Sequence, residues 1–279
     1  MTNTAYPSDK KGLGIVGIIF LSMLVFSPVN YFLDGTLGKG PSFLIYYCLS
    51  MGVPFALIHF LKKRNEGTVR YQFVPKDIIV VLLIIIATIA LQWGVSGPIS
   101  SSIPMPESFK EIFREVALSM NNWYGLISVA IAAPLFEELI FRGVILDGLL
   151  KRKSAWTAII LSSVLFGIVH LNPWQFVSAM VIGMFAGWVY YRTRSLIYSI
   201  FVHFANNFTV SIFMVFDEDN SMMDAELSDL YGGTGNMYVI IALCIIIASS
   251  CIYVLNKRLK DERLPDEREI SLKSTLQEF

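Results

Sequence analysis

The sequence predicts an all-α polytopic membrane protein in which about eight transmembrane helices form one bundle. Of its 279 residues, 54% are hydrophobic and only 16% are charged, whereas soluble domains are roughly 45–50% apolar and about 25% charged. The mean hydropathy is +0.59, and the apolar residues gather in runs long enough to cross a bilayer at 1.5 Å per residue. This composition excludes a disordered chain, a basic nucleic-acid-binding protein and a disulfide scaffold.

Eight apolar runs account for most of the chain. They cover residues 13–33, 42–61, 77–97, 124–147, 155–170, 174–191, 195–216 and 237–256. The first run follows Lys10 and Lys11 without a small-residue cleavage site, so it predicts an anchor rather than a removable signal peptide. We expect three regions: N-terminal spans with an interfacial segment in 1–123, a core in 124–216, and an acidic loop, a last span and a charged tail in 217–279.

The distribution of basic residues predicts the orientation. If the N-terminus is inside, only Lys39, Lys110 and Arg114 of the 22 Lys and Arg residues fall in external segments. Arg142 lies within a span, and the remaining 18 all fall on the inner side. Because cytoplasmic loops of membrane proteins carry the excess of Lys and Arg, both termini are predicted to be cytoplasmic.

Two segments depart from the regular pattern of spans and loops. The turn at 171–174 carries no charge, so it is predicted to lie below the headgroups, where protein or trapped water must satisfy its backbone. Residues 106–122 have apolar side chains at helical spacing among charges, which predicts either an interfacial helix or a surface helix that caps the bundle. These side chains are Phe109, Ile112, Phe113 and Val116.

The fourth span contains three ionisable residues, which are costly in hydrocarbon and therefore indicate a function by default. Glu138 and Arg142 have the spacing of an i,i+4 ion pair, and an ion pair that only fixes helix packing is an equal alternative for them. Glu137 points in another direction at 100° per residue and has no partner on its own helix. It lies about 20 Å along the helix from the cytoplasmic end at Lys151. Such a deep carboxylate favours a role as general acid or base.

Two histidines lie within later spans. His170 ends the fifth span in the run LFGIVHLN, and His203 lies in the seventh, in FVHFANNF, with Asn207 four residues on along the same face. Taken singly, each fits an ordinary hydrogen bond between helices. Together with Glu137 they predict one site. By simple counting, however, His170 lies nearer the external side, whereas His203 lies only about 13 Å along its helix from Arg194 on the inner side.

These positions form three ordered signatures, and through them the chain resembles the CPBP intramembrane proteases, also called the CAAX-protease and bacteriocin-processing or Abi family. The signatures are two glutamates with an arginine four residues later, a phenylalanine with a histidine four later, and a histidine with an asparagine four later. In this sequence they are Glu137, Glu138 and Arg142, then Phe166 and His170, then His203 and Asn207. All lie within 124–216, which the resemblance makes the catalytic core.

The resemblance implies an intramembrane endopeptidase that hydrolyses membrane-associated peptides or proteins through a glutamate-activated water, in an eight-span fold and most simply in a bacterial plasma membrane. No nucleic-acid partner is expected, because the composition excludes a basic nucleic-acid-binding protein. The implied roles are Glu137 as general base, His170 in holding the water, His203 and Asn207 as the oxyanion site, and Glu138, Arg142 and Phe166 in support.

No cofactor is favoured, but a zinc site is an alternative. Glu137, His170 and His203 are ligand types that zinc hydrolases use, with the fourth position left for water. The helical signature of two histidines separated by Glu-x-x is absent from the sequence, which favours the metal-independent mechanism.

Two other classes of protein fit the same bundle. One is a non-enzymatic membrane scaffold or bacteriocin-immunity protein, and the other is a proton-coupled transporter, since buried carboxylates and histidines also form proton relays. The intact signatures favour the enzyme over a scaffold, and the sequence lacks the internal repeats expected of a transporter.

An acidic loop joins the last two spans. It either attracts a cationic peptide or is simply a solvated loop that helps to fix the topology. Its acidic residues are Asp217, Glu218, Asp219, Asp224, Glu226 and Asp229.

Overall fold

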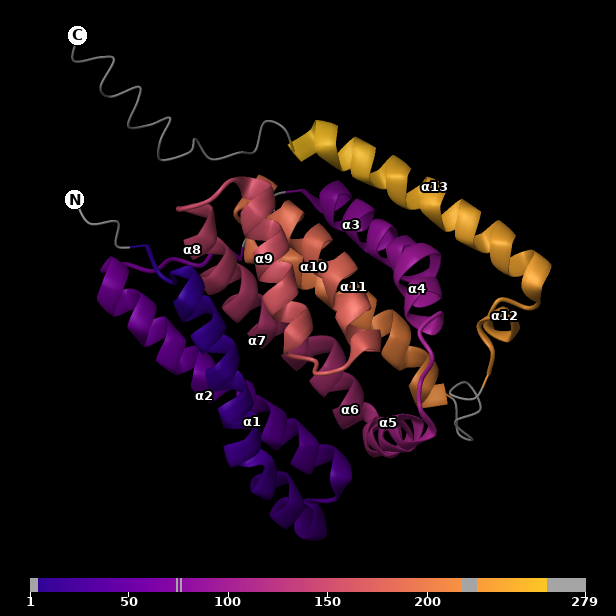
Figure 1. Ribbon diagram of the computed structural model, residues 1–279, viewed down its shortest axis with the longest axis horizontal. Coiled ribbons are helices and arrows are strands. Elements are labelled where there is room, and N and C mark those ends of the chain that lie inside the picture. Colours follow the sequence, from indigo (N-terminus) through magenta and orange to yellow (C-terminus); the bar gives the residue numbers. More distant parts are fainter. Residues whose placement is uncertain (1–4, 74, 76, 217–224, 260–279) are drawn as a thin grey trace.

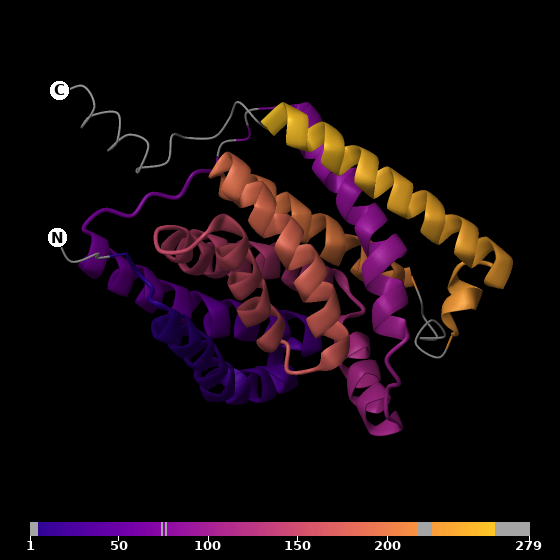
Figure 2. The same cartoon turned by 45° about the horizontal axis from the view of Figure 1, so that its top comes forward.

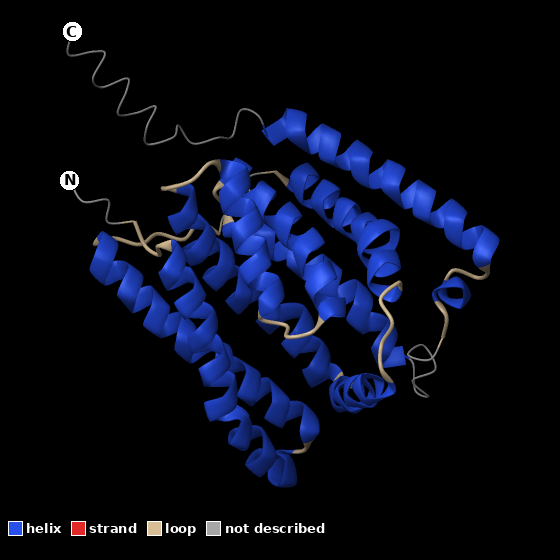
Figure 3. Ribbon diagram, viewed as in Figure 1, coloured by secondary structure: helices blue, strands red, loops and turns tan. Residues whose placement is uncertain are grey.

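Helices are the only regular secondary structure in the part that the structure describes, which confirms the predicted fold class. The computed structural model describes residues 5–73, 75, 77–216 and 225–259, and these contain helices and loops but no strand (Figure 3). The helices are α1 (Asp9–Leu37), α2 (Lys39–Glu66), α3 (Ile78–Leu91), η1 (Gln92–Ser96), α4 (Gly97–Ser101), α5 (Glu107–Met120), α6 (Trp123–Ile127), η2 (Ser128–Ala132), α7 (Ala133–Ile140), η3 (Phe141–Leu146), α8 (Asp147–Leu150), α9 (Ala155–Ile168), α10 (Pro173–Thr193), α11 (Leu196–Phe216), α12 (Leu227–Leu230) and α13 (Thr234–Arg258).

The long helical segments coincide with the predicted spans. They are α1, α2, α3 continued through η1 and α4, the run from α6 to α8, and then α9, α10, α11 and α13. Among the described residues, four segments are long and apolar enough to cross a membrane, namely α1, α2, Ile78–Ser101 and α13. Shorter apolar helices cover Ala155–Ile168 and Leu196–Ile212. The chain is therefore an integral, polytopic membrane protein.

The helices α7, α9, α10 and α11 form the middle of the molecule (Figures 1 and 2). The α1–α2 hairpin covers one side, and α3 with α13 covers the other. Buried apolar side chains fill both contacts, for example Ile19 and Ile58 on the first side and Ile84 and Leu255 on the second. The outer faces of α1 and α13 are exposed and apolar, as a helix in contact with lipid requires.

The helix ends that were predicted to be cytoplasmic all lie at one end of the bundle. The start of α1 is joined to the loop after α8, that loop to the end of α2, and the end of α13 to the start of α3. The ion pairs are Asp9–Lys153 at 2.8 Å, Glu66–Lys151 at 3.1 Å and Asp77–Arg258 at 2.5 Å. Asp77 also caps α3, and the hydrogen bond from Arg258 holds the pKa of its carboxyl below the usual value. That this end faces the cytoplasm stays a prediction.

The amphipathic segment forms helix α5 at the opposite end of the bundle (Figure 1). Phe109 and Phe113 pack against Trp174, with ring centroids 5.4 and 6.1 Å apart. Ile112 and Val116 remain exposed on the same apolar arc. The helix is thus attached to the bundle through part of its apolar arc and leaves the rest of that arc unpacked, which suits both interpretations of this segment.

Part of the last predicted region lies outside the described residues. Asp217, Glu218, Asp219 and Asp224 of the acidic loop belong to that part, as does the tail at 260–279. Glu226 and Asp229 are described and exposed, the first at the N-cap of the short helix α12 and the second within it.

Candidate active site

The fourth span is a single rod interrupted by two π-helical stretches, η2 before the glutamates and η3 after them. A π-helix shifts the hydrogen-bond register by one residue and often occurs at functional sites. In each stretch, side chains of other helices donate to backbone carbonyls. Asn207 donates to Val129 O at 2.9 Å, Ser162 to Phe141 O at 3.1 Å and Lys62 to Gly143 O at 2.9 Å.

Glu138 and Arg142 form the predicted ion pair, with Nη1 2.7 Å from Oε1 and both side chains 1% exposed. The second arm of the guanidinium donates to Gly183 O on α10 at 2.9 Å. A Cβ at Gly183 would lie 3.3 Å from that Nη2 atom and 3.2 Å from Ser163, so the glycine lets α10 approach closely. The pair therefore fixes the fourth span, where α7 continues into η3, against α10.

Glu137 is buried on a different face of α7, with 9% of the residue exposed. Its Oε1 accepts a 2.5 Å hydrogen bond from the Tyr47 hydroxyl on α2. Its Oε2 is also buried and makes no hydrogen bond with any described residue. One oxygen of this carboxylate is thus held, while the other has free lone pairs.

His203 lies between the two glutamates. Its Nδ1 is 3.0 Å from Glu138 Oε1, and its Nε2 is 3.8 Å from Glu137 Oε2. Although the carboxylates leave α7 in different directions, one imidazole on α11 reaches both. An ionised carboxylate only accepts hydrogen bonds, so contact with Glu138 places a proton on Nδ1.

His170 follows the end of α9 and lies beside Phe166. The Phe166 ring contacts both, with centroids 5.2 Å from His170 and 5.3 Å from His203. Nδ1 of His170 lies 3.0 Å from Phe166 O. The early end of α9 and the following turn, where Leu171 has a φ of 57°, bring His170 within reach of the buried aromatic cluster. No hydrogen bond or ion pair joins it to either glutamate within the described residues.

Asn207 lies one turn beyond His203 on α11 and is directed at the π-helical stretch η2. Its amide donates to Val129 O, and its Oδ1 accepts from Asn206 at 3.0 Å. The structure thus brings Glu137, Glu138 and His203 into one group and places Asn207 beside that group rather than in contact with it.

The alternative zinc ligands are not gathered into a metal site. Across the described residues, no group of three or more His, Cys, Asp or Glu side chains is arranged to hold a metal ion. Glu137 approaches His203, whereas the described side-chain contacts of His170 are with Phe166.

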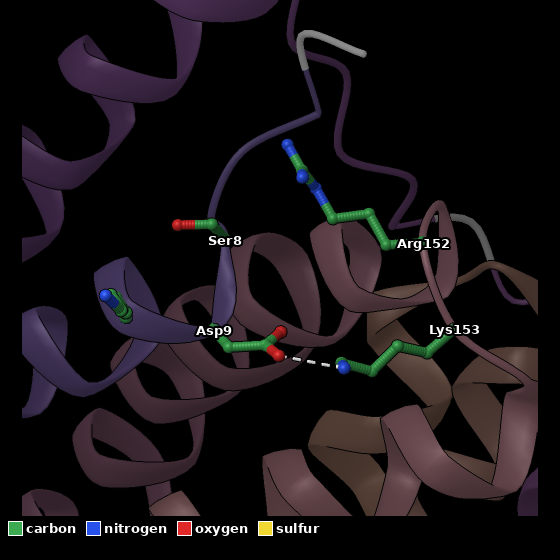
Figure 4. Close-up of a pocket in the computed structure, with 5 residues that line it drawn as sticks. Ser8, Asp9, Arg152 and Lys153 are labelled. Carbon is green, nitrogen blue, oxygen red and sulfur yellow. Dashed lines mark ion pairs between the residues drawn. The ribbon is translucent and has the colours of Figure 1, made fainter.

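A separate hollow of about 340 Å³ lies at the surface where α1 begins (Figure 4). Ser8, Asp9, Lys10, Arg152 and Lys153 line it, and Lys153 pairs with Asp9. It is at the charged end of the bundle, roughly 20 Å of helix away from the glutamates. It is not part of the buried group.

Tyr47, which donates to Glu137, is a residue of the site that the sequence signatures do not include. It lies 90 residues before Glu137 in the chain, on a helix that carries none of the signatures. Its chemistry could have singled it out in the sequence, because a tyrosine hydroxyl inside an apolar span requires a hydrogen-bond partner.

Comparison with known proteins links this region to one family. Residues 119–209 match the family described as type II CAAX prenyl endopeptidase Rce1-like. The resemblance to the CAAX-protease family is thereby confirmed. The matched residues hold all three signatures, whereas Tyr47 lies outside this Rce1-like segment.

Curated relatives match a part of this chain. The "Putative membrane peptidase YdiL" of Bacillus subtilis is 33% identical over 87 residues, which are 31% of this chain and 36% of the relative. The UPF0177 protein YxdF of Lactococcus lactis is 28% identical over 110 residues, or 39% of this chain and 58% of the relative. This chain therefore spans about a third to somewhat over half of the length of these relatives. No solved structure gives a match.

Proposed function

We propose that this chain is an intramembrane endopeptidase that hydrolyses peptide bonds of membrane-associated peptides or proteins, with Glu137 as the base that activates water. One observation supports this above all. Glu137 is buried among membrane-spanning helices, its Oε1 is held by Tyr47, and its Oε2 has no protein donor among the described residues. A buried carboxylate oxygen with free lone pairs has the chemistry needed to accept a proton from water. The endopeptidase description of the matched family supports the same class of reaction.

The reaction proceeds through a tetrahedral intermediate. Glu137 Oε2 takes one proton from the water, and the water oxygen bonds to the carbonyl carbon of the substrate. The carbonyl electron pair moves to its oxygen, which becomes an oxyanion. When the C–N bond breaks, Glu137 returns the proton to the leaving nitrogen. Positioned hydrogen-bond donors in a site of low dielectric constant stabilise the oxyanion.

His203 and Asn207 are the proposed donors to that oxyanion. Because Glu138 accepts at Nδ1 of His203, Nε2 can donate only when the ring is the imidazolium. That cation would balance the second carboxylate, since Arg142 alone offsets only one of the two glutamates. Asn207 has a second amide hydrogen besides the one directed at Val129 O. In this proposal Glu138 and Arg142 orient His203 and α7.

His170 is proposed to hold the attacking water. Its Nδ1 faces the carbonyl oxygen of Phe166, which is only an acceptor, so Nδ1 carries the proton. The neutral ring then has a lone pair on Nε2 that can accept a hydrogen bond from water. The described side-chain contacts of His170 are with Phe166 and not with Glu137, so in this role the water connects the imidazole with Glu137.

A comparison of membrane peptides tests the proposed function without any assumption about the substrate. Membranes of cells that express either the wild-type chain or Glu137→Ala are digested and analysed by mass spectrometry for chain ends that no added protease explains. We expect at least one cleaved species only with the wild-type chain. If the two peptide populations are identical, the protease proposal loses its support and a scaffold or immunity function becomes the better explanation.

Metal removal tests the mechanism separately. We expect cleavage by the purified protein to continue at an unchanged rate after dialysis against a strong chelator, because the proposed base is a carboxylate that needs no metal. Metal analysis of the dialysed sample is the control for complete removal. Loss of cleavage that stoichiometric zinc restores would instead support the ligand set of Glu137, His170 and His203.

A further inference from the structure

The hydroxyl of Tyr47 is the one described donor to Glu137 from another helix. The 2.5 Å hydrogen bond joins α2 to α7, and the tyrosine lies outside the Rce1-like segment. Its ring is packed against Phe43, with centroids 6.2 Å apart. The N-terminal hairpin therefore contributes directly to the surroundings of the proposed base.

The position of α2 relative to α7 is fixed by more than this one bond. Toward the charged end of the bundle, Lys62 is buried and binds Asp147 at 2.6 Å and Gly143 O at 2.9 Å. Midway, Gly52 faces the Phe136 ring closely enough that a Cβ there would be 3.4 Å away. The tyrosine is thus presented to Glu137 by a helix that is packed along the whole fourth span.

The contact determines which carboxylate oxygen is available. The terminal torsion of a glutamate is broad and roughly two-fold, so an unrestrained carboxylate exchanges its two oxygens readily. Here Oε1 is bound to Tyr47, which directs Oε2 toward His203 Nε2 at 3.8 Å. A general base acts efficiently only if the accepting atom is held within reach of the proton.

We propose that Tyr47 is a positioning residue of the active site: it binds Glu137 Oε1 so that Oε2 is the oxygen that takes the proton from the attacking water. This role rests on the proposed function. It adds to the site a residue from outside the family-matched segment, and it makes α2 necessary for catalysis as well as for anchorage.

The alternative is that Tyr47 only fills space between α2 and α7. Tyr47→Phe separates the two possibilities, because it removes the hydroxyl and keeps the ring. Tyr46→Phe is the matched control, since Tyr46 is the next residue on the same helix, and its hydroxyl is directed at Met23 O on α1 at 3.5 Å. Both variants lose one oxygen atom from one tyrosine, and only one of these oxygens touches Glu137.

Kinetics provides the first measurement, with a synthetic peptide that contains a cleavage site found in the membrane comparison as the probe. We expect Tyr47→Phe to lower kcat by about 10- to 100-fold, the size of a lost hydrogen bond to a charged group, with KM within about twofold of wild type. Tyr46→Phe should leave both constants within about twofold of wild type. A Tyr47→Phe protein with wild-type kcat would overturn the positioning role, as would a rise in KM alone.

Infrared difference spectroscopy provides a second measurement that needs no substrate. The carboxyl band lost in Glu137→Gln identifies Glu137, and we expect that band to shift in Tyr47→Phe but not in Tyr46→Phe, because only the first change removes a hydrogen bond to it. An unshifted band overturns the contact itself. If the band shifts but the wild-type protein cleaves nothing, the contact is real and the proposed function has failed, so the two failures are distinguishable.

Discussion

Replacement of Glu137 by glutamine is expected to abolish cleavage while leaving the protein folded in the membrane. The amide nitrogen that replaces a carboxylate oxygen cannot accept a proton from water, and loss of a general base lowers rates by about 100- to 10,000-fold. The fold should survive because Tyr47 can still donate to the amide oxygen in place of Oε1. Cleavage of the identified peptide, measured beside the wild-type chain, is the readout.

Glu107→Gln is the control for this prediction. Glu107 lies on the surface helix α5, where its side chain is 67% exposed and pairs with Lys110. The chemical change is identical, but the site is untouched, so cleavage should equal that of wild type. Thermal unfolding in detergent should be similar for all three proteins. Full activity of Glu137→Gln would remove this residue from the mechanism, and a misfolded variant would be recognised from the unfolding curve.

The parts of the site that could be predicted from the sequence are those set by a single helix. Glu138 and Arg142 are four residues apart, so helix geometry alone brings them together, and the structure has the pair at 2.7 Å. The eight helical segments were also predictable, because run length and composition determine them locally. The charges of the loops also predicted which helix ends lie together at one end of the bundle, and the ion pairs at that end agree with this prediction.

The contacts between helices could not be predicted in the same way. Nothing in the sequence gives the register of α2 against α7, so the hydrogen bond between Tyr47 and Glu137 could not be predicted. The π-helical stretches change which faces the fourth span presents, and a count at 100° per residue does not include them. For this reason the count gave no sign that one imidazole, that of His203, would reach both glutamates.

The depth of His170 illustrates the same limit of local reasoning. Counting along the chain placed it nearer the external side than His203, whereas the Phe166 ring contacts both imidazoles. Helix α9 ends at Ile168, and the tight turn that follows, with Leu171 at a φ of 57°, leaves His170 beside Phe166. The depth of a group in a membrane protein is therefore set by tertiary packing as much as by its distance from a loop.

Replacement of Arg142 by methionine is expected to have the largest effect on stability. The guanidinium is 1% exposed, pairs with Glu138 and binds Gly183 O on another helix. Methionine would fill part of the space but leave the Glu138 charge buried beside only His203, and removal of one partner of a buried pair costs about 3–5 kcal/mol. Thermal unfolding in detergent should therefore show a much lower Tm than that of wild type.

Two further variants show whether the lost charge is the cause. Arg64→Met makes the same substitution at an exposed position on α2 and should change the free energy of unfolding by no more than about 0.5 kcal/mol. The double variant Glu138→Gln with Arg142→Met removes both charges and should recover much of the stability, since no uncompensated ion remains. A double variant no more stable than Arg142→Met would mean that the loss comes from the contacts with Gly183 and Phe166 instead. In that case Arg142 would act mainly by joining η3 to α9 and α10.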